Sequence, residues 1–226
     1  MALFQKTGND YQKLTYLNRY LGESIILCGT GPSLHGVDPE GLRKKGMPIL
    51  GLNNSFEIVD LDFWMTCDSP DQFDKKIWEK ECLKFCAWNW REESAIQDRK
   101  NILFYKAYGL EEGNSEEFDE SLVVNGPYIN FVFEGCTFPM ALHMVYWLGF
   151  RRVFLVGCDF GGKSHLSTLS NKFCEEHQKL NLERGFNALR EASDAGALEL
   201  ISCTADSPIN SFLPYEEWPE VATLKV

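Results

Sequence analysis

The stretch SIILCGTGPSL, residues 24–34, decides the fold of this chain. Four apolar residues, 25–28, run directly into Gly29-Thr30-Gly31-Pro32-Ser33. The apolar run predicts a strand that is buried on both faces, and the glycines predict a tight turn at its carboxyl end. Glycines two residues apart let the main chain approach an anion closely, and the N-terminus of a following helix favours negative charge. We therefore expect this turn to offer backbone N–H groups to a phosphate-bearing ligand.

This turn differs from the dinucleotide-binding pattern G-x-G-x-x-G. Leu34 stands where the third glycine would be, and Pro32 lies inside the turn. NAD is therefore not the first ligand we expect. An isolated G-x-G is also compatible with a plain strand-to-loop turn that binds nothing, and this alternative stays open at this point.

Short apolar runs recur along the rest of the chain, with helical or loop segments between them. The predicted strands cover residues 25–28, 49–52, 63–67, 85–88, 102–105, 153–156 and 198–203. Several are continuously apolar, which is typical of parallel strands covered by helices on both faces. The order strand, helix, strand predicts a single α/β domain over residues 1–226, with a doubly wound, mostly parallel, Rossmann-like sheet.

Two longer segments are predicted to be helices. Residues 137–148 are almost all apolar, which indicates a helix buried against the sheet, with Thr137 as N-cap and Gly149 just past its end. Residues 183–195 have apolar side chains at helical spacing and are followed by Gly196. Between the two helices, residues 161–180 are polar and begin with two glycines, so we expect a small lid there.

Length and charge limit the classes of function. The chain has 226 residues and a net charge of −11, so it can bury one sizeable core and is a poor candidate for gripping nucleic acid. We expect no membrane span, since no apolar run approaches about 18 residues. The polar N-terminus predicts no secretory signal, so we expect a cytoplasmic protein. The eight cysteines form no CxxC pair and predict reduced thiols, with no metal site.

Small and polar residues follow each predicted strand at its carboxyl end. In a doubly wound sheet these ends meet at one edge, where ligands bind. The predicted nucleotide-binding residues are Gly29, Thr30, Gly31, Pro32, Ser33, Asn53, Asn54, Asp68, Thr137 and Gly157. The asparagines suit a ribose or a base edge, although Asn is also common in turns. Asp68 suits a ribose, a magnesium ion or a proton, and a capping role is its structural alternative.

Histidine is the side chain that titrates near neutral pH without help, so it is the natural acid/base candidate. His177 and His165 lie in the polar region after the strand at 153–156. Asp159, which directly follows that strand, is the third candidate catalytic residue. The alternative for Asp159 is an orienting role, in which its carboxylate holds N–H groups of the glycine turn.

Three stretches together resemble a known family. Residues 26–34 (ILCGTGPSL), 51–55 (GLNNS) and 148–160 (LGFRRVFLVGCDF) resemble the bacterial sialyltransferases, over roughly residues 24–215. A similar pattern occurs in the 6-hydroxymethylpterin pyrophosphokinase-like group and in phage and flagellin-glycosylation proteins. The phage-type members are the most similar in length, which favours a bacterial or phage source.

The resemblance implies a glycosyltransferase that moves a sugar from a nucleotide-sugar donor, a CMP-sugar, to a hydroxyl of a sugar or glycan acceptor. It assigns the nucleotide phosphate to the glycine turn, the nucleotide to Asn53 or Asn54, and the catalytic base to His177 or His165, without a required metal. The pterin group leaves a Mg-ATP-dependent pyrophosphokinase as the alternative, and a non-catalytic nucleotide-binding module is a third. The oligomeric state stays open, with a homo-oligomer among the alternatives.

The chain also departs from the sialyltransferase pattern. Residues 133–137 (FEGCT) contain no arginine, and Gly161-Gly162-Lys163 stands where that family has tyrosines that assist the leaving phosphate. The resemblance therefore predicts a nucleotide-sugar donor without selecting sialic acid as the sugar.

Overall fold

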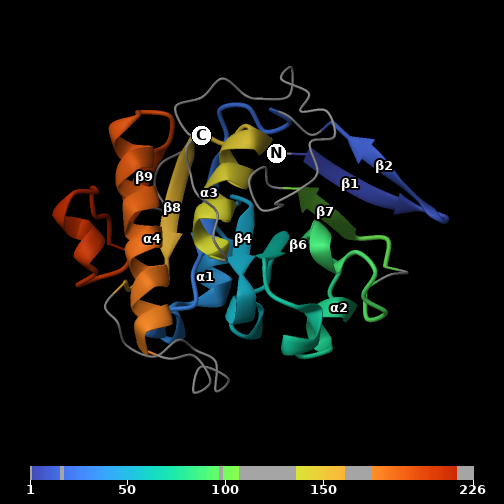
Figure 1. Ribbon diagram of the computed structural model, residues 1–226. Coiled ribbons are helices and arrows are strands. Elements are labelled where there is room, and N and C mark those ends of the chain that lie inside the picture. The colour runs from blue at the N-terminus through green and yellow to red at the C-terminus, as the bar shows by residue number, and fades with distance from the viewer. Residues whose placement is uncertain (1, 16–17, 97–98, 107–135, 161–174, 218–226) are drawn as a thin grey trace.

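The computed structural model describes residues 2–15, 18–96, 99–106, 136–160 and 175–217. Its centre is a sheet of seven parallel strands, in the spatial order β7-β6-β5-β4-β3-β8-β9 (Figure 1). The strands are β3 (Ser24–Cys28), β4 (Ile49–Leu52), β5 (Phe63–Thr66), β6 (Leu83–Ala87), β7 (Ile102–Lys106), β8 (Arg152–Val156) and β9 (Glu199–Ser202). Each strand lies within about two residues of its predicted range. The predicted α/β, doubly wound, mostly parallel sheet is therefore confirmed.

A hairpin at the N-terminus extends the sheet and was not predicted. Strand β1 (Ala2–Thr7) pairs antiparallel with β2 (Asp10–Leu14) and with β7, which brings the sheet to nine strands in the described residues. The two strands are joined by Gly8 and Asn9, and Gly8 has a φ of 65°. A two-residue loop that begins with glycine is typical of a hairpin, so this pair was the available signal.

Helices cover both faces of the sheet. Helices α3 (Thr137–Leu148) and α4 (Glu175–Asp194) lie side by side on one face (Figure 1). The short helices α1 (Pro39–Arg43) and α2 (Lys76–Glu79) lie on the other. Alternate residues of β3 enter the two cores: Ile25 and Leu27 pack in the α3–α4 core, and Ile26 and Cys28 pack in the opposite core. This explains why the strand is continuously apolar.

The two long helices differ from the prediction at their N-terminal ends. Helix α3 ends as expected, at Gly149 with a φ of 108°, but its N-cap is Cys136 and not Thr137. The Thr137 hydroxyl contacts Cys67 and Asn53 in place of the helix end. Helix α4 begins at Glu175 and not at Glu183. Residues 175–180 of the predicted lid are therefore helical, while residues 161–174 lie outside the described residues.

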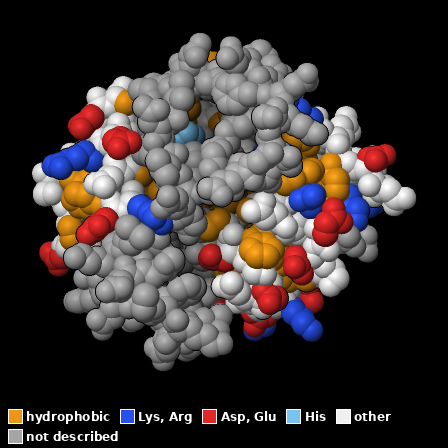
Figure 2. Space-filling view, in the orientation of Figure 1, with side chains coloured by type: hydrophobic (Ala, Val, Ile, Leu, Met, Phe, Trp, Pro, Cys, Tyr) orange, Lys and Arg blue, Asp and Glu red, His pale blue; other side chains and the backbone are white. Residues whose placement is uncertain are grey.

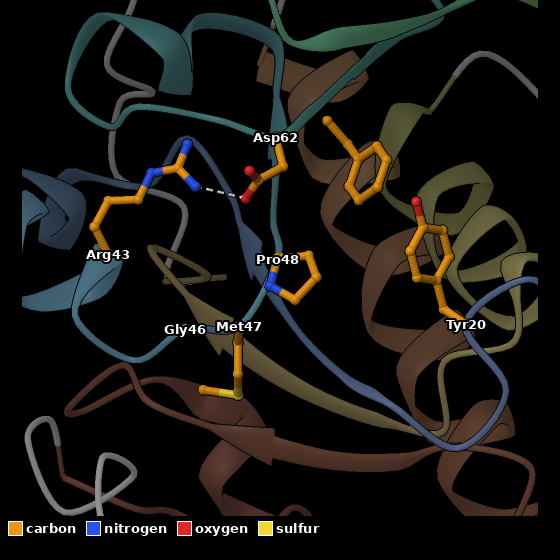
Figure 3. A pocket seen from close by; sticks show the side chains of 7 residues that line it. Tyr20, Arg43, Gly46, Met47, Pro48 and Asp62 are labelled. Carbon is orange, nitrogen blue, oxygen red and sulfur yellow. Dashed lines mark hydrogen bonds and ion pairs between the residues drawn. The ribbon is translucent and has the colours of Figure 1, made fainter. Parts of the chain in front are cut away.

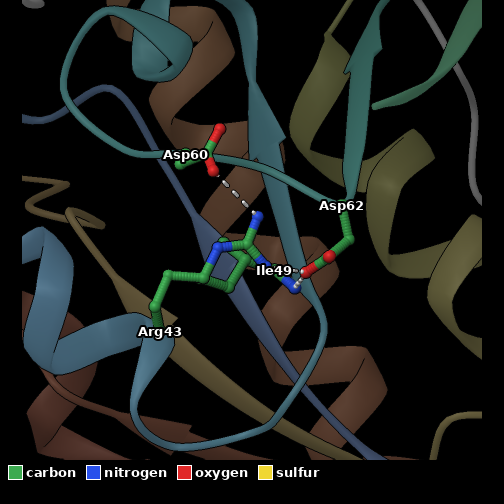
Figure 4. Close-up of polar contacts among 4 residues, drawn as sticks. All are labelled: Arg43, Ile49, Asp60 and Asp62. Carbon is green, nitrogen blue, oxygen red and sulfur yellow. Dashed lines mark hydrogen bonds and ion pairs between the residues drawn. The ribbon is translucent and has the colours of Figure 1, made fainter. Parts of the chain in front are cut away.

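At the amino-terminal edge of the sheet, one carboxylate ties together the starts of two strands (Figure 4). Asp62 Oδ2 accepts a hydrogen bond from Ile49 N at 2.8 Å and from Arg43 Nη1 at 2.7 Å. Arg43 Nη2 also lies 3.5 Å from Asp60 Oδ2. The pKa of Arg43 is raised: partial burial lowers it, and the bonds to Asp62 and Asp60 outweigh that effect. The cluster fixes the α1–β4 connection against β5.

The buried thiols make the fold sensitive to alkaline pH. Burial raises the pKa of Cys28 and of Cys86 from 9.0 to about 12. A group with a raised pKa stabilises the fold fully below its unfolded-state pKa, and this stability is lost as pH rises toward the folded-state value. We expect the free energy of unfolding to fall above pH ~9, by roughly 1 kcal/mol per buried thiol near pH 10.

Urea unfolding at pH 7.5 and at pH 10 measures this loss, since two pH values on either side of the thiol's ordinary pKa separate the two regimes. The control is Cys86→Ala, which removes one titrating thiol and is expected to lose less stability between the two pH values than the wild type does. Equal pH dependence in the two proteins would contradict the assignment to this thiol.

Candidate functional site

The chain changes direction between β3 and β8. Strand β3 leads through α1 to β4 on one face of the sheet, and β8 leads through α4 to β9 on the opposite face. β3 and β8 are parallel neighbours, so both strands end at the same edge of the sheet. Because their connections run over opposite faces, the chain segments beyond the two turns lead away from each other. In doubly wound sheets this point is where ligands bind. The predicted glycine turn after β3 therefore lies at the expected place for a ligand.

The turns that follow β3 and β8 are packed directly against each other. Gly29 N donates to Val156 O and Gly31 N donates to Gly157 O, both at 2.8 Å. A Cβ atom added to Gly29 would lie 2.5 Å from Gly157 O, a distance that side chains do not adopt. Gly157 itself has a φ of 66°, in the left-handed region that favours glycine. The glycines are thus required for the contact between the two turns.

Asp159 holds the far side of the glycine turn. Its Oδ2 atom accepts a hydrogen bond from Ser33 Oγ at 2.8 Å and from Ser33 N at 3.2 Å. A Cβ atom on Gly31 would lie 1.8 Å from this same oxygen. The orienting role that the sequence offered as the alternative for Asp159 is present in the structure. Whether Asp159 also takes part in catalysis stays a prediction.

The glycine turn does not present its amides in the way that the sequence suggested. The N–H groups of Gly29, Gly31 and Ser33 all donate within the protein, and Pro32 has no N–H. The oxygens of Val156, Gly157 and Asp159 compete for these donors, which the spacing of the glycines alone could not reveal. Thr30 is half-buried between the two glycines, and its contact with a ligand stays a prediction.

The segment after β9 supports the turn after β8. Thr204 Oγ1 accepts a hydrogen bond from Cys158 N at 3.1 Å. Ser207 Oγ donates to Cys158 O at 2.8 Å and to Asp159 O at 3.1 Å. Both side chains are buried. Thr204 and Ser207 therefore fix the backbone of the turn after β8, which carries Asp159.

A second polar cluster joins the carboxyl ends of β4 and β5 to the start of α3. Asn53 follows β4 and has a φ of 44°, and its Oδ1 atom lies 3.4 Å from Thr137 Oγ1. The Thr137 hydroxyl also accepts a hydrogen bond from Cys67 N at 3.3 Å. The predicted site residues Asn53 and Thr137 are therefore in contact. Asn54 is half-buried beside Asn53.

Asp68 lies at the same edge, directly after β5 and Cys67. It is half-buried, and its backbone N–H donates to Thr66 Oγ1 at 3.0 Å. Burial, with the negative charge of Asp68 as the second cause, raises the pKa of the Cys67 thiol from 9.0 to about 12. Cys67 therefore carries its proton at neutral pH and can act as a hydrogen-bond donor.

Helix α4 is the wall of the site next to β8. Phe138 of α3 and Phe160 after β8 pack edge to face, with ring centroids 5.2 Å apart. Gly185 of α4 lies against this pair, since a Cβ atom there would be 2.7 Å from the Phe160 ring. His177 is two turns closer to the N-terminus of the helix than Gly185, about 12 Å along its axis. Because α4 runs antiparallel to β8, this end of the helix extends past the carboxyl edge of the sheet (Figure 1).

His165 lies outside the described residues, as does the start of the predicted lid. Figure 2 shows acidic and basic side chains interspersed over the described part of one face, so the net charge does not gather there in one patch. Within the described residues, no group of three His, Cys, Asp or Glu side chains is arranged to hold a metal ion.

Comparison with known proteins gives structural neighbours only. No protein-family model matches the chain, and no curated protein matches it. The sialyltransferase CstII from Campylobacter jejuni, solved with the substrate analogue CMP-3FNeuAc, superposes with a TM-score of 0.52 and 13% identity, covering 85% of this chain and 86% of that one. The sialyltransferase CST-II solved with a trisaccharide acceptor and CMP gives a TM-score of 0.51 and 15% identity, covering 90% and 89%.

These alignments span almost the whole length of both chains. The chain has a sialyltransferase-like fold. At this level of identity the likeness concerns the fold and not the reaction. Among the described residues, no helix is both long and apolar enough to cross a membrane.

A cavity of about 320 Å³ lies at the opposite edge of the sheet (Figure 3). It is lined by residues that lie before, or at the start of, β3, β4 and β5: Tyr20, Arg43, Gly46, Met47, Pro48, Asp62 and Phe63. Since ligands of doubly wound sheets bind beyond the carboxyl ends of the strands, this cavity is not part of the candidate site.

Sequence reasoning missed one residue that shapes the site. Trp64, in the middle of β5, is fully buried, and its Nε1 atom donates to Asn53 O at 2.6 Å. A tryptophan in an apolar strand is most simply interpreted as core, and nothing in its sequence context marks the indole N–H. The signal that could have found it is the need of a buried indole N–H for an acceptor.

Proposed function

We propose that this protein is a glycosyltransferase that uses a nucleotide-sugar donor, of the CMP-sugar class, and transfers the sugar to a hydroxyl group. The observation that carries the proposal is the site at the β3–β8 switch point. There the glycine turn, Asp159 and the Asn53–Thr137 cluster lie at one edge of a sheet whose fold matches that of CstII over 85% of the chain. The CstII structures were solved with CMP or a CMP-sugar analogue.

In the proposed reaction, the nucleotide lies across the carboxyl ends of β3, β4 and β5. Thr30, Asn53 and Asn54 are the side chains we assign to it, and Asp68 is assigned to its ribose. Gly29, Gly31, Pro32 and Ser33 shape the turn beneath the phosphate, with Asp159 as their anchor. Thr137 and Gly157 complete the edge of the site.

The chemical step is a direct displacement at the anomeric carbon of the donor sugar. The acceptor hydroxyl oxygen forms the new bond to this carbon while the bond from the carbon to the phosphate oxygen breaks. The proton of the hydroxyl moves to His177, and the bonding electron pair leaves with the nucleotide phosphate. The position of His177 in the first turns of α4, beyond the edge of the sheet, supports its role as the base. His165 is the other candidate.

The first test is thermal unfolding with CMP, CDP, UDP, GDP and ATP, each with magnesium and with EDTA. A ligand at 100 times its dissociation constant adds about 2.7 kcal/mol of stability, which for a chain of this size is roughly 5–10 °C. We expect CMP to give the largest shift, with and without metal. Release of CMP from a CMP-sugar in the presence of a glycan acceptor then tests transfer.

The same experiment separates the rival functions. A shift with ATP that requires magnesium would contradict the proposal and favour pyrophosphoryl transfer. A shift with CMP but no release of CMP from any CMP-sugar would favour a non-catalytic nucleotide-binding module. No shift with any nucleotide would overturn the nucleotide site itself.

A further inference from the structure

Asn53 is held in an unusual conformation by residues from two different layers of the protein. Its backbone is left-handed, with a φ of 44°, at the point where β4 ends and a 3₁₀ turn (Asn53–Glu57) begins. Asparagine tolerates this region better than most residues, but the conformation needs support from its surroundings. The support comes from Trp64 of β5, whose side chain packs in the core with α1 and α2, and from Thr137 at the start of α3, on the opposite face of the sheet.

Trp64 fixes the backbone carbonyl. Its indole Nε1 donates to Asn53 O at 2.6 Å, and its ring is fully buried. Phe73 and Trp78 pack edge-on against this ring, with centroids at 5.1 and 5.3 Å. Because the ring is enclosed by other aromatic rings, the indole N–H cannot move away from the carbonyl without disturbing the α2 core.

Thr137 fixes the side chain of Asn53 from the opposite core. Its hydroxyl lies 3.4 Å from Asn53 Oδ1 and 3.0 Å from Cys67 Sγ, and it accepts from Cys67 N. The protonated Cys67 thiol can donate to the Thr137 oxygen, as the pKa of about 12 allows at neutral pH. The hydroxyl hydrogen is then available to Asn53 Oδ1.

This arrangement fixes which end of the Asn53 amide faces the site. With Oδ1 directed to Thr137, the NH₂ group points away from α3. Within the described residues, Asn53 Nδ2 donates no hydrogen bond to the protein. A ligand atom next to this group must be an acceptor, such as a base carbonyl, a ring nitrogen or a ribose oxygen.

We infer that Trp64 and Thr137 are positioning residues that hold Asn53 from two sides, so that its NH₂ group is presented as a donor to an acceptor atom of the nucleotide. The identity of the ligand rests on the proposed function. The positioning of Asn53 belongs to the free protein, so it can be tested without a ligand.

The variants are Trp64→Phe, which keeps an aromatic ring but removes the indole N–H, and Thr137→Val, which keeps the shape but removes the hydroxyl. Two matched controls accompany them. Trp78→Phe makes the same change in the neighbouring ring of the same core, and Thr137→Ser restores the hydroxyl. Each protein is examined by ¹⁵N relaxation of the Asn53 side-chain NH₂ in the free state, and by calorimetric titration with CMP.

We expect the Asn53 NH₂ to be rigid in the wild type and in both controls, and mobile in Trp64→Phe and Thr137→Val. The dissociation constant for CMP is expected to rise about tenfold in each of these two variants, as for the loss of one net hydrogen bond, and less than about twofold in the controls. In an Asn53→Ala background neither change should weaken CMP binding further, since a positioning residue acts only through the group that it holds.

Two results would overturn the inference: an Asn53 NH₂ whose mobility is the same in all variants, or losses of affinity that persist in the Asn53→Ala background. If the wild type does not bind CMP, the proposed function fails, and the relaxation data alone decide the positioning of Asn53.

Discussion

Replacing Gly29 by alanine is expected to destabilise the protein by about 3 kcal/mol, through overpacking and the loss of a backbone hydrogen bond. The added Cβ atom would meet Gly157 O at 2.5 Å, the carbon of the same carbonyl at 3.2 Å and Cys158 Sγ at 3.1 Å. The carbonyl is part of the backbone and cannot rotate away. The turns after β3 and β8 must therefore separate, which weakens the bond from Gly29 N to Val156 O. Thermal unfolding should show a fall of roughly 6–12 °C.

The matched control is Gly36→Ala, a few residues further along the same segment. A Cβ atom there would have no neighbour within 4 Å, and Gly36 does not have a positive φ. We expect its melting temperature to stay within about 2 °C of the wild type, since surface changes away from special features cost little. Equal melting temperatures for Gly29→Ala and Gly36→Ala would contradict the close contact between the two turns.

Gly29→Ala is also informative about the site. Both turns belong to the candidate nucleotide site, so their separation should weaken CMP binding in the fraction of protein that stays folded. Titration well below the melting temperature of the variant separates this effect from unfolding. Unchanged affinity for CMP in a destabilised Gly29→Ala protein would place the nucleotide elsewhere along the edge of the sheet.

The parallel sheet is well predicted from the sequence because the side chains of its strands pack into a core on each face of the sheet. This explains why β3 is a continuous apolar run, and why the apolar run of β8 is equally clear in the sequence. The hairpin β1–β2 has no such requirement, since β2 is mostly exposed. The first turns of α4, residues 175–181 (EEHQKLN), contain only one apolar residue, so a search for apolar periodicity does not find them.

The candidate site could be predicted only in part. Its place follows from the glycine turn, because chain order and parallel strands bring the carboxyl ends together. The partners of individual atoms do not follow. Whether the N–H of Gly31 faces a ligand or Gly157 O depends on the depth at which two turns pack, and the contact between Trp64 and Asn53 depends on the register of β4 against β5.

The proposed mechanism makes its strongest prediction at His177. We expect His177→Ala to lower kcat for sugar transfer by about 10²- to 10⁴-fold, the usual contribution of a general base. KM for the donor should change little, because a base that acts on the acceptor hydroxyl does not hold the nucleotide. Steady-state kinetics with a CMP-sugar at several acceptor concentrations measure both constants. The pH dependence gives a second readout, since the acid limb near the ordinary histidine pKa should disappear.

Two further variants decide between His177 and its alternatives. His35→Ala is the control, because His35 is exposed in the short 3₁₀ turn after the glycine turn and has no assigned role. His165→Ala tests the rival base. The position of α4 favours His177, since the antiparallel run from β8 brings the first turns of the helix beyond the carboxyl edge of the sheet, where an acceptor can approach the donor sugar. Full turnover in His177→Ala together with a large loss in His165→Ala would move the base to His165, and full turnover in both would refute base catalysis by either histidine.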